Sequence, residues 1–105
     1  MVDIKQTAEF ADWLDGLKDK RAQLRIDIRI LRLANGNPGE HRDLKGGISE
    51  LKIREGQAYR VYYTKRHGEL VILLCGGDKA SKAKQQADIA KARRFAANLG
   101  ETDDY

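Results

Sequence analysis

The chain has few of the features that mark a secreted or membrane protein. Its 105 residues include one cysteine and one proline. Because Cys75 has no second cysteine to pair with, an internal disulfide is excluded and a reducing compartment fits. The longest unbroken apolar run, from Leu70 to Cys75, is far too short to cross a bilayer. The charged residues soon after Met1 give no secretion signal, so we expect a cytoplasmic protein that does not enter a membrane.

The common catalytic motifs are also missing. There is no glycine-rich phosphate loop, no zinc-ligand spacing and no nucleophile elbow. His41 and His67 lie in segments that read as loops, without metal-ligand spacing, and are interpreted as surface residues. Cys75 ends an apolar run and is interpreted as a small buried hydrophobic side chain rather than a nucleophile. No metal and no cofactor are expected.

Positive charge is what the sequence does have, and it is concentrated. The formal net charge is +4 and the isoelectric point is about 9.3. Residues 79–94 hold six basic residues against one acidic, and residues 19–33 hold five against two. The tail 101–105 carries only acidic charge and is expected to be disordered. Concentrated positive charge favours a polyanionic partner. The arginine stripe of residues 21–32 is interpreted as a solvent-exposed face rather than a binding site.

Hydrophobic periodicity predicts one α+β domain over residues 1–105, with the element order β-α-α-β-β-β-α. A first strand is predicted at Val2–Gln6. Thr7 and Asp19 are candidate N-caps for two helices, and Asn35-Gly36 is expected to end the second. The segment Leu24–Ile30 alternates like a strand. It lies, however, in a patterned segment that continues without a break for about fifteen residues, and this length favours a helix.

Three strand segments follow, and their short spacing predicts an antiparallel meander. They are Ile48–Arg54, Ala58–Lys65 and Leu70–Cys75, with Gly76-Gly77 expected to end the third. A last helix is predicted at Ser81–Leu99. Two early helices packed on a small antiparallel sheet complete the predicted fold.

Alternation along these strands gathers cationic side chains on one face. If Leu51, Ile53, Val61 and Tyr63 are buried against helices, then Lys52, Arg54, Arg60 and Tyr62 lie on the open face, near Lys79 after the glycine pair. Such a surface suits RNA, because cations neutralise phosphates and a tyrosine ring can stack on an unpaired base. Cleavage also needs stabilisation of a phosphorane and two proton transfers, for which arginine and lysine are suitable. The alternative is a merely solvated sheet face.

Three sequence blocks resemble a known family over about residues 3–99. They are Phe10–Asp19, then Glu50–Arg54 with Gly56 and Tyr59–Tyr63, then Leu73–Lys79. Together they resemble the addiction-module killer proteins, a HigB-like, phage-derived Gp49-like branch of the RelE/ParE toxin superfamily. The combination of Cys-Gly-Gly-Asp-Lys with Tyr-Arg-Val-Tyr-Tyr is the most specific part of the resemblance.

The resemblance implies a RelE-like fold and the toxin of a type II toxin–antitoxin system. Such a toxin is a metal-independent endoribonuclease that cleaves mRNA on the ribosome. A cognate antitoxin, often a helix-turn-helix protein from the neighbouring gene, holds it silent. By similarity the catalytic cluster falls on Lys52, Arg54, Arg60 and Lys79, and substrate binding on Tyr62, Lys45, Lys82 and Gln85.

One position departs from the RelE branch. A tyrosine early in the last helix stacks on the target base there, whereas the matching position here is about Gln85. Tyr62 is the candidate substitute. Because one fold can support several activities, a ParE-like gyrase inhibitor and a non-catalytic RNA-binding module remain alternatives.

Overall fold

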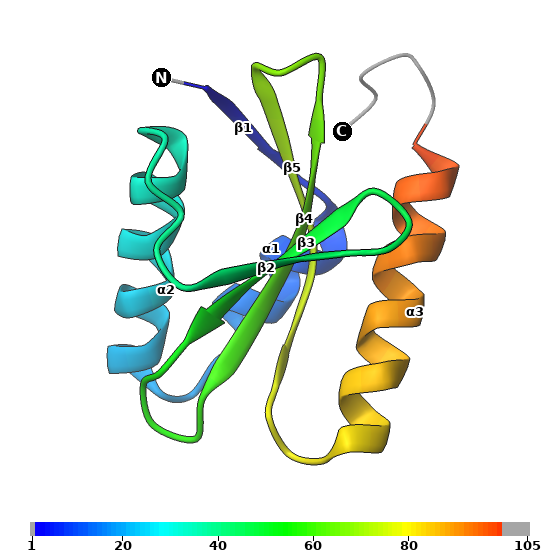
Figure 1. Cartoon of the computed structure of the whole chain (residues 1–105). Coiled ribbons are helices and arrows are strands. Elements are labelled where there is room, and N and C mark those ends of the chain that lie inside the picture. Colours follow the sequence, from blue (N-terminus) through cyan, green and yellow to red (C-terminus); the bar gives the residue numbers. More distant parts are fainter. Residues whose placement is uncertain (1, 100–105) are drawn as a thin grey trace.

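The computed structural model describes residues 2–99 and confirms the α+β class (Figure 1). It has three helices and a five-stranded mixed sheet. In chain order the elements are β1 (Asp3–Gln6), α1 (Ala8–Asp15), α2 (Lys20–Ala34), β2 (His41–Leu44), β3 (Ile48–Ile53), β4 (Tyr59–Arg66), β5 (Leu70–Asp78) and α3 (Lys82–Asn98). The tail predicted to be disordered, 101–105, lies outside the described residues. No helix within the described part of the chain combines the length and apolar character that a membrane span requires.

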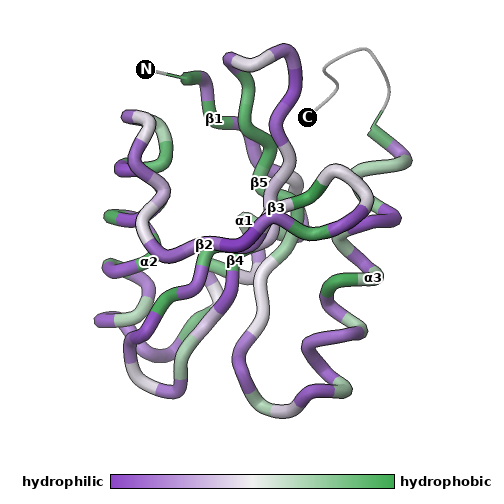
Figure 2. Tube along the Cα trace, in the orientation of Figure 1, coloured by the Kyte–Doolittle hydropathy of each residue, from purple (hydrophilic) through white to green (hydrophobic). Residues whose placement is uncertain are grey.

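The sheet has the strand order β1-β5-β4-β3-β2. The predicted meander of β3, β4 and β5 is confirmed, and β1 adds to β5 in parallel. The sequence did not predict β2, which pairs with β3 at the edge of the sheet. Figure 2 shows why, since most of β2 is hydrophilic and lacks the alternation typical of a half-buried strand. The observed order is therefore β-α-α-β-β-β-β-α.

The three helices begin at side chains that accept hydrogen bonds from the first turn. Thr7 accepts from the Phe10 amide at 3.0 Å, and Asp19 accepts from two amides of the first turn of α2. Ser81 accepts from the Lys84 amide at 3.0 Å. Each cap satisfies a donor that the helix itself leaves unpaired, so the predicted starts of the helices are confirmed.

Strand β5 runs through Gly76 and Gly77, so the prediction that these glycines end the strand is wrong. They are needed where helices approach the sheet from opposite sides. A Cβ at Gly76 would lie 2.3 Å from the Trp13 ring, and a Cβ at Gly77 would lie 2.1 Å from Asp88 Oδ2. The glycine pair therefore marks close packing rather than a chain break.

Two hydrophobic clusters lie on the two faces of the sheet (Figure 1). Helices α1 and α2 cover one face, where the predicted burial is confirmed for Leu51, Ile53, Val61 and Tyr63. The prediction that the other face is open is wrong, because α3 packs on it. Its cluster includes Tyr62, Ile72, Leu74, Ile89 and Ala92. Only the part of this face beyond the start of α3 can serve as a binding surface.

Helix α2 holds one buried arginine in its packed stripe. The Arg29 guanidinium donates to the carbonyl oxygens of Lys52 at 2.6 Å, Pro38 at 2.8 Å and Glu40 at 2.7 Å. Burial lowers its pKa, mainly through loss of hydration. The interpretation of the arginine stripe as a solvent face is therefore wrong for Arg29. This side chain ties α2 to β3 and to the loop before β2, near the candidate site.

A candidate anion-binding hollow

A hollow of about 60 Å³, here called the basic hollow, lies between the β3–β4 turn and the segment after β5. It is lined by Lys52, Ile53, Arg54, Ala58, Tyr59, Arg60 and Lys79. All four residues predicted to be catalytic therefore line one hollow. Backbone pairing explains this, because Lys52 lies opposite Arg60 in the β3–β4 register. The Lys79 amide donates to the Ala58 carbonyl at 3.1 Å, which holds the segment after β5 against the same turn.

Arg60 is the deepest of these cations, with 9% of its surface exposed. Its Nε lies 3.4 Å from Oε2 of Glu50, a carboxylate with no exposed surface. The other oxygen of Glu50 lies 3.4 Å from Arg42 Nη2. Neither Glu50 oxygen makes a hydrogen bond within the described residues, and neither do Arg60 Nε and Nη1. Arg60 thus has two buried nitrogens without a hydrogen-bond partner, and a buried carboxylate opposes its charge.

Arg54 lines the basic hollow but already has an ionic partner. It follows the last residue of β3, and its Nε and Nη2 donate to the two Glu40 oxygens at 2.6 and 2.7 Å. This hydrogen bond raises the pKa of Arg54 and lowers that of Glu40. The Arg54 side chain is largely exposed, so the pair contributes little stability but screens this cation. Lys52 is half-buried and Lys79 is exposed.

A second, larger hollow adjoins the first. It has a volume of about 390 Å³ and is lined by Arg42, Lys79, Ser81, Lys82, Gln85 and Gln86. Lys79 lines both hollows. The predicted substrate-binding residues Lys82 and Gln85 are therefore brought next to the predicted catalytic cluster. Arg42 was missed because its strand, β2, was missed.

The structure does not bring Lys45 to this region. It lies in the turn before β3, at the end of that strand away from Lys52, and it lines neither hollow. Its carbonyl accepts from Arg93 Nε at 2.9 Å instead. The predicted grouping of Lys45 with the other substrate-binding residues is therefore wrong.

Tyr62 cannot act as an exposed stacking platform. Its side chain is 1% exposed beneath α3, and burial, followed by the charge of Glu50, raises its pKa. The prediction of an accessible Tyr62 is therefore wrong. Tyr59 and Tyr63 are also buried, so no tyrosine of residues 2–99 presents an open ring. At the start of α3, Lys84 contacts Asp88 at 3.1 Å, and its pKa is raised because the two nearby aspartates outweigh the effect of burial.

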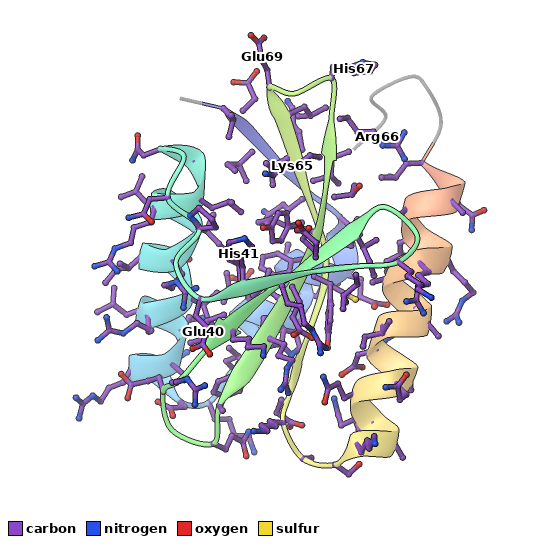
Figure 3. The ribbon with its side chains drawn as sticks, viewed as in Figure 1. Glu40, His41, Lys65, Arg66, His67 and Glu69 are labelled. Carbon is purple, nitrogen blue, oxygen red and sulfur yellow. The ribbon has the colours of Figure 1, made fainter. Side chains whose placement is uncertain are left out.

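The remaining titratable candidates lie away from the two hollows. Figure 3 shows His41 on the β2 edge of the sheet and His67 at the tip of the β4–β5 hairpin. Both are exposed, which confirms their interpretation as surface residues. Cys75 is buried as predicted, and burial raises its thiol pKa to about 12. Across the described residues, no three histidine, cysteine or carboxylate side chains gather as metal ligands would.

Fold and site together define a small α+β protein with adjoining cationic hollows at one end of its sheet. The family model of the phage-derived Gp49-like proteins matches residues 12–96, and the chain belongs to this family. A protein of Haemophilus influenzae is 48% identical over 99 residues, which cover 94% of this chain and 97% of the relative. That relative is described as an uncharacterized protein. The Gp49-like part of the resemblance is thereby confirmed.

Proposed function

We propose that this protein is the toxin of a type II toxin–antitoxin system and inhibits translation by cleaving mRNA on the ribosome. The basic hollow is the observation that carries this proposal, because it gathers four cationic side chains from three separate segments. A hollow with this charge suits a phosphate group. The RelE-like resemblance of the sequence blocks supplies the reaction class.

The side chains of the basic hollow suit cleavage without a metal. The ribose 2′-OH attacks the adjacent phosphorus and loses its proton, while the 5′-oxygen leaves and gains one. Arg60 lines the hollow, and because its buried Nε and Nη1 make no hydrogen bond within the described residues, its guanidinium can turn to bind the phosphorane oxygens. Lys52 lies opposite Arg60 on β3, and Lys79 follows β5 on the other side of β4. These two lysines are the candidates for the proton transfers.

The second hollow suits the nucleotide next to the scissile phosphate. Lys82 offers a charge for a neighbouring phosphate, and the amides of Gln85 and Gln86 can hydrogen-bond to a base edge. The proposed antitoxin, from the neighbouring gene, would oppose this charge with an acidic or amphipathic segment over the basic hollow or α3.

Induction of the chain alone tests the proposal. We expect growth arrest, relief by the neighbouring protein, and mRNA cuts at positions occupied by ribosomes. Lys79→Ala should remove the cuts. Lys65→Ala is the matched control, since this exposed lysine lies near the opposite end of the sheet (Figure 3). Normal growth at confirmed high expression would refute the toxin assignment, and arrest without mRNA cuts would point to a ParE-like inhibitor.

The buried tyrosines favour a second candidate function, RNA binding without turnover. With Gln85 beside the second hollow and Tyr62 under α3, no tyrosine of the described chain can stack on a target base. Phosphate contacts alone would give binding without the base positioning that cleavage needs. Tight RNA binding with intact mRNA on translating ribosomes would establish this alternative.

A further inference from the structure

We propose that Glu50 is a positioning residue that holds Arg60 in the basic hollow and Arg42 in the second hollow. This inference rests on the proposed function for its effect on cleavage, but its structural part can be tested separately. Glu50 lies in the middle of β3 and is fully buried. Its two oxygens lie 3.4 Å from one arginine each.

The two arginines line different hollows, so a single carboxylate connects both. Arg60 lines the basic hollow and Arg42 lines the second hollow. The strand register produces this arrangement. Arg42 lies directly opposite Glu50 on β2, and Arg60 lies on β4 two residues before Tyr62, the residue opposite Glu50 on that strand. Glu50 therefore lies between the two arginines, on the face that α3 covers.

The charge balance explains why Arg60 needs this carboxylate. Lys52 lies directly opposite Arg60 across the strands, and Lys79 lines the same hollow. Like charges at such a position repel each other, and burial adds a desolvation penalty for Arg60. Glu50 is the acidic partner that Arg60 contacts within the described residues. Without its charge, the Arg60 guanidinium should turn toward solvent and leave the hollow.

The contact positions Arg60 without using up its donors. Arg60 Nε and Nη1 make no hydrogen bond within the described part of the chain, although Nε lies at ion-pair distance from Glu50. By contrast, Arg54 uses both of its contacting nitrogens on Glu40. Arg60 is therefore compensated by charge without being held in hydrogen bonds through these two buried nitrogens, so its guanidinium can turn toward an anion that enters the hollow.

A double-mutant cycle tests the proposal. Glu50→Gln keeps the shape and removes the charge, and it should lower mRNA cleavage by about the 10²–10³-fold expected for loss of one transition-state donor. In an Arg60→Ala background, Glu50→Gln should cause far less further loss than in the wild-type chain, because its effect on the transition state acts through Arg60 and only Arg42 is left for it to position. Glu55→Gln is the matched control, since its contact, Arg25, lies outside both hollows. Wild-type cleavage by folded Glu50→Gln, or losses that multiply, would overturn the proposal.

A second measurement is independent of cleavage. Nuclear magnetic resonance can follow hydrogen exchange at Arg60 Nε, which is buried beside Glu50. Exchange should be at least tenfold faster in Glu50→Gln than in wild type and unchanged in Glu55→Gln. This result with a wild-type chain that cuts no mRNA would support the positioning role and reject the proposed function. Unchanged exchange would overturn the positioning role.

Glu50→Asp keeps the proposal testable if Glu50→Gln does not fold. It retains the charge but is one methylene shorter, so it should fold, show intermediate cleavage and show intermediate exchange at Arg60 Nε. If Glu50→Asp also fails to fold, Glu50 is a folding residue and the positioning role is rejected.

Discussion

Adding one methyl group at Gly76 should destabilise the protein more than adding it at the neighbouring Gly77. At Gly76, the new Cβ would meet three atoms of the Trp13 ring at 2.3, 2.4 and 2.6 Å. Trp13 contacts Phe10 and Tyr59, with ring centroids 5.7 and 6.2 Å away, so its ring has little freedom to move. Overpacking of this kind costs about 1–3 kcal/mol, and we expect about 2 kcal/mol for Gly76→Ala.

At Gly77 the obstacle is the end of a side chain. The Cβ would lie 2.1 Å from Asp88 Oδ2, which can rotate away if it gives up its contact with Lys84 at 3.1 Å. Asp88 is mostly buried, but Lys84 is partly exposed and can follow the displaced carboxylate, so weakening this ion pair should cost about 1 kcal/mol. Both substitutions reduce the entropy of the unfolded chain alike, so this term cancels in the comparison.

Urea unfolding followed by the fluorescence of Trp13, the only tryptophan, measures the difference. At about 4–8 °C per kcal/mol for a domain of this size, Gly76→Ala should melt about 8–16 °C below wild type. In a Trp13→Val background, Gly76→Ala should cause only a small further loss of stability. Circular dichroism is the probe for these variants, because they lack the tryptophan. Equal stability of the two alanine variants, or a less stable Gly77→Ala, would refute the packing argument.

Three further outcomes are expected. Lys79→Ala should lower mRNA cleavage by about 10²–10⁴-fold, as expected for loss of a proton-transfer group, while changing the free energy of unfolding by about 0.5 kcal/mol or less; a large loss of stability would contradict its exposed position. Arg29→Met leaves three carbonyls without their donor, so urea unfolding should show a loss of about 3 kcal/mol, and an unchanged midpoint would contradict its tying role. Cys75, with a pKa raised from 9.0 to about 12, should resist alkylation at pH 8 until urea unfolds the chain. Its folded pKa exceeds the unfolded value, so its contribution to stability is complete below pH 9 and is lost as the pH rises toward 12; a flat stability profile over that window would contradict its burial.

Local signals in the sequence were sufficient for most of the fold. Thr7, Asp19 and Ser81 cap their helices because each side chain bonds to amides two or three residues ahead, which requires no distant partner. Strand β2 could not be predicted in the same way. At the sheet edge it is stabilised by backbone pairing with β3, and its exposed residues need no apolar alternation.

The candidate site was predictable only in part. Strand alternation places Lys52 and Arg60 on one face, and the cross-strand register confirms their juxtaposition. Alternation does not show what covers that face, and so Tyr62 was predicted to be accessible although α3 buries it. Glu50 shares the alternation of Lys52, but its two ionic contacts depend on β2 and β4. Those contacts exist only in three dimensions.

The composition of α3 explains why its packing was hard to foresee and why the site lies where it does. The helix contacts the sheet partly through small side chains, Ala92 and Ala96, which bring it close to β5 without a wide apolar stripe. Its close approach buries polar groups on the covered face, and these need partners, as Asp88 has in Lys84 and Glu50 has in Arg60. Beyond the start of α3, the cationic residues that line the two hollows are no longer covered by this helix. The proposed cleavage is therefore expected at that end, where cationic side chains line the two hollows and an anion can reach them.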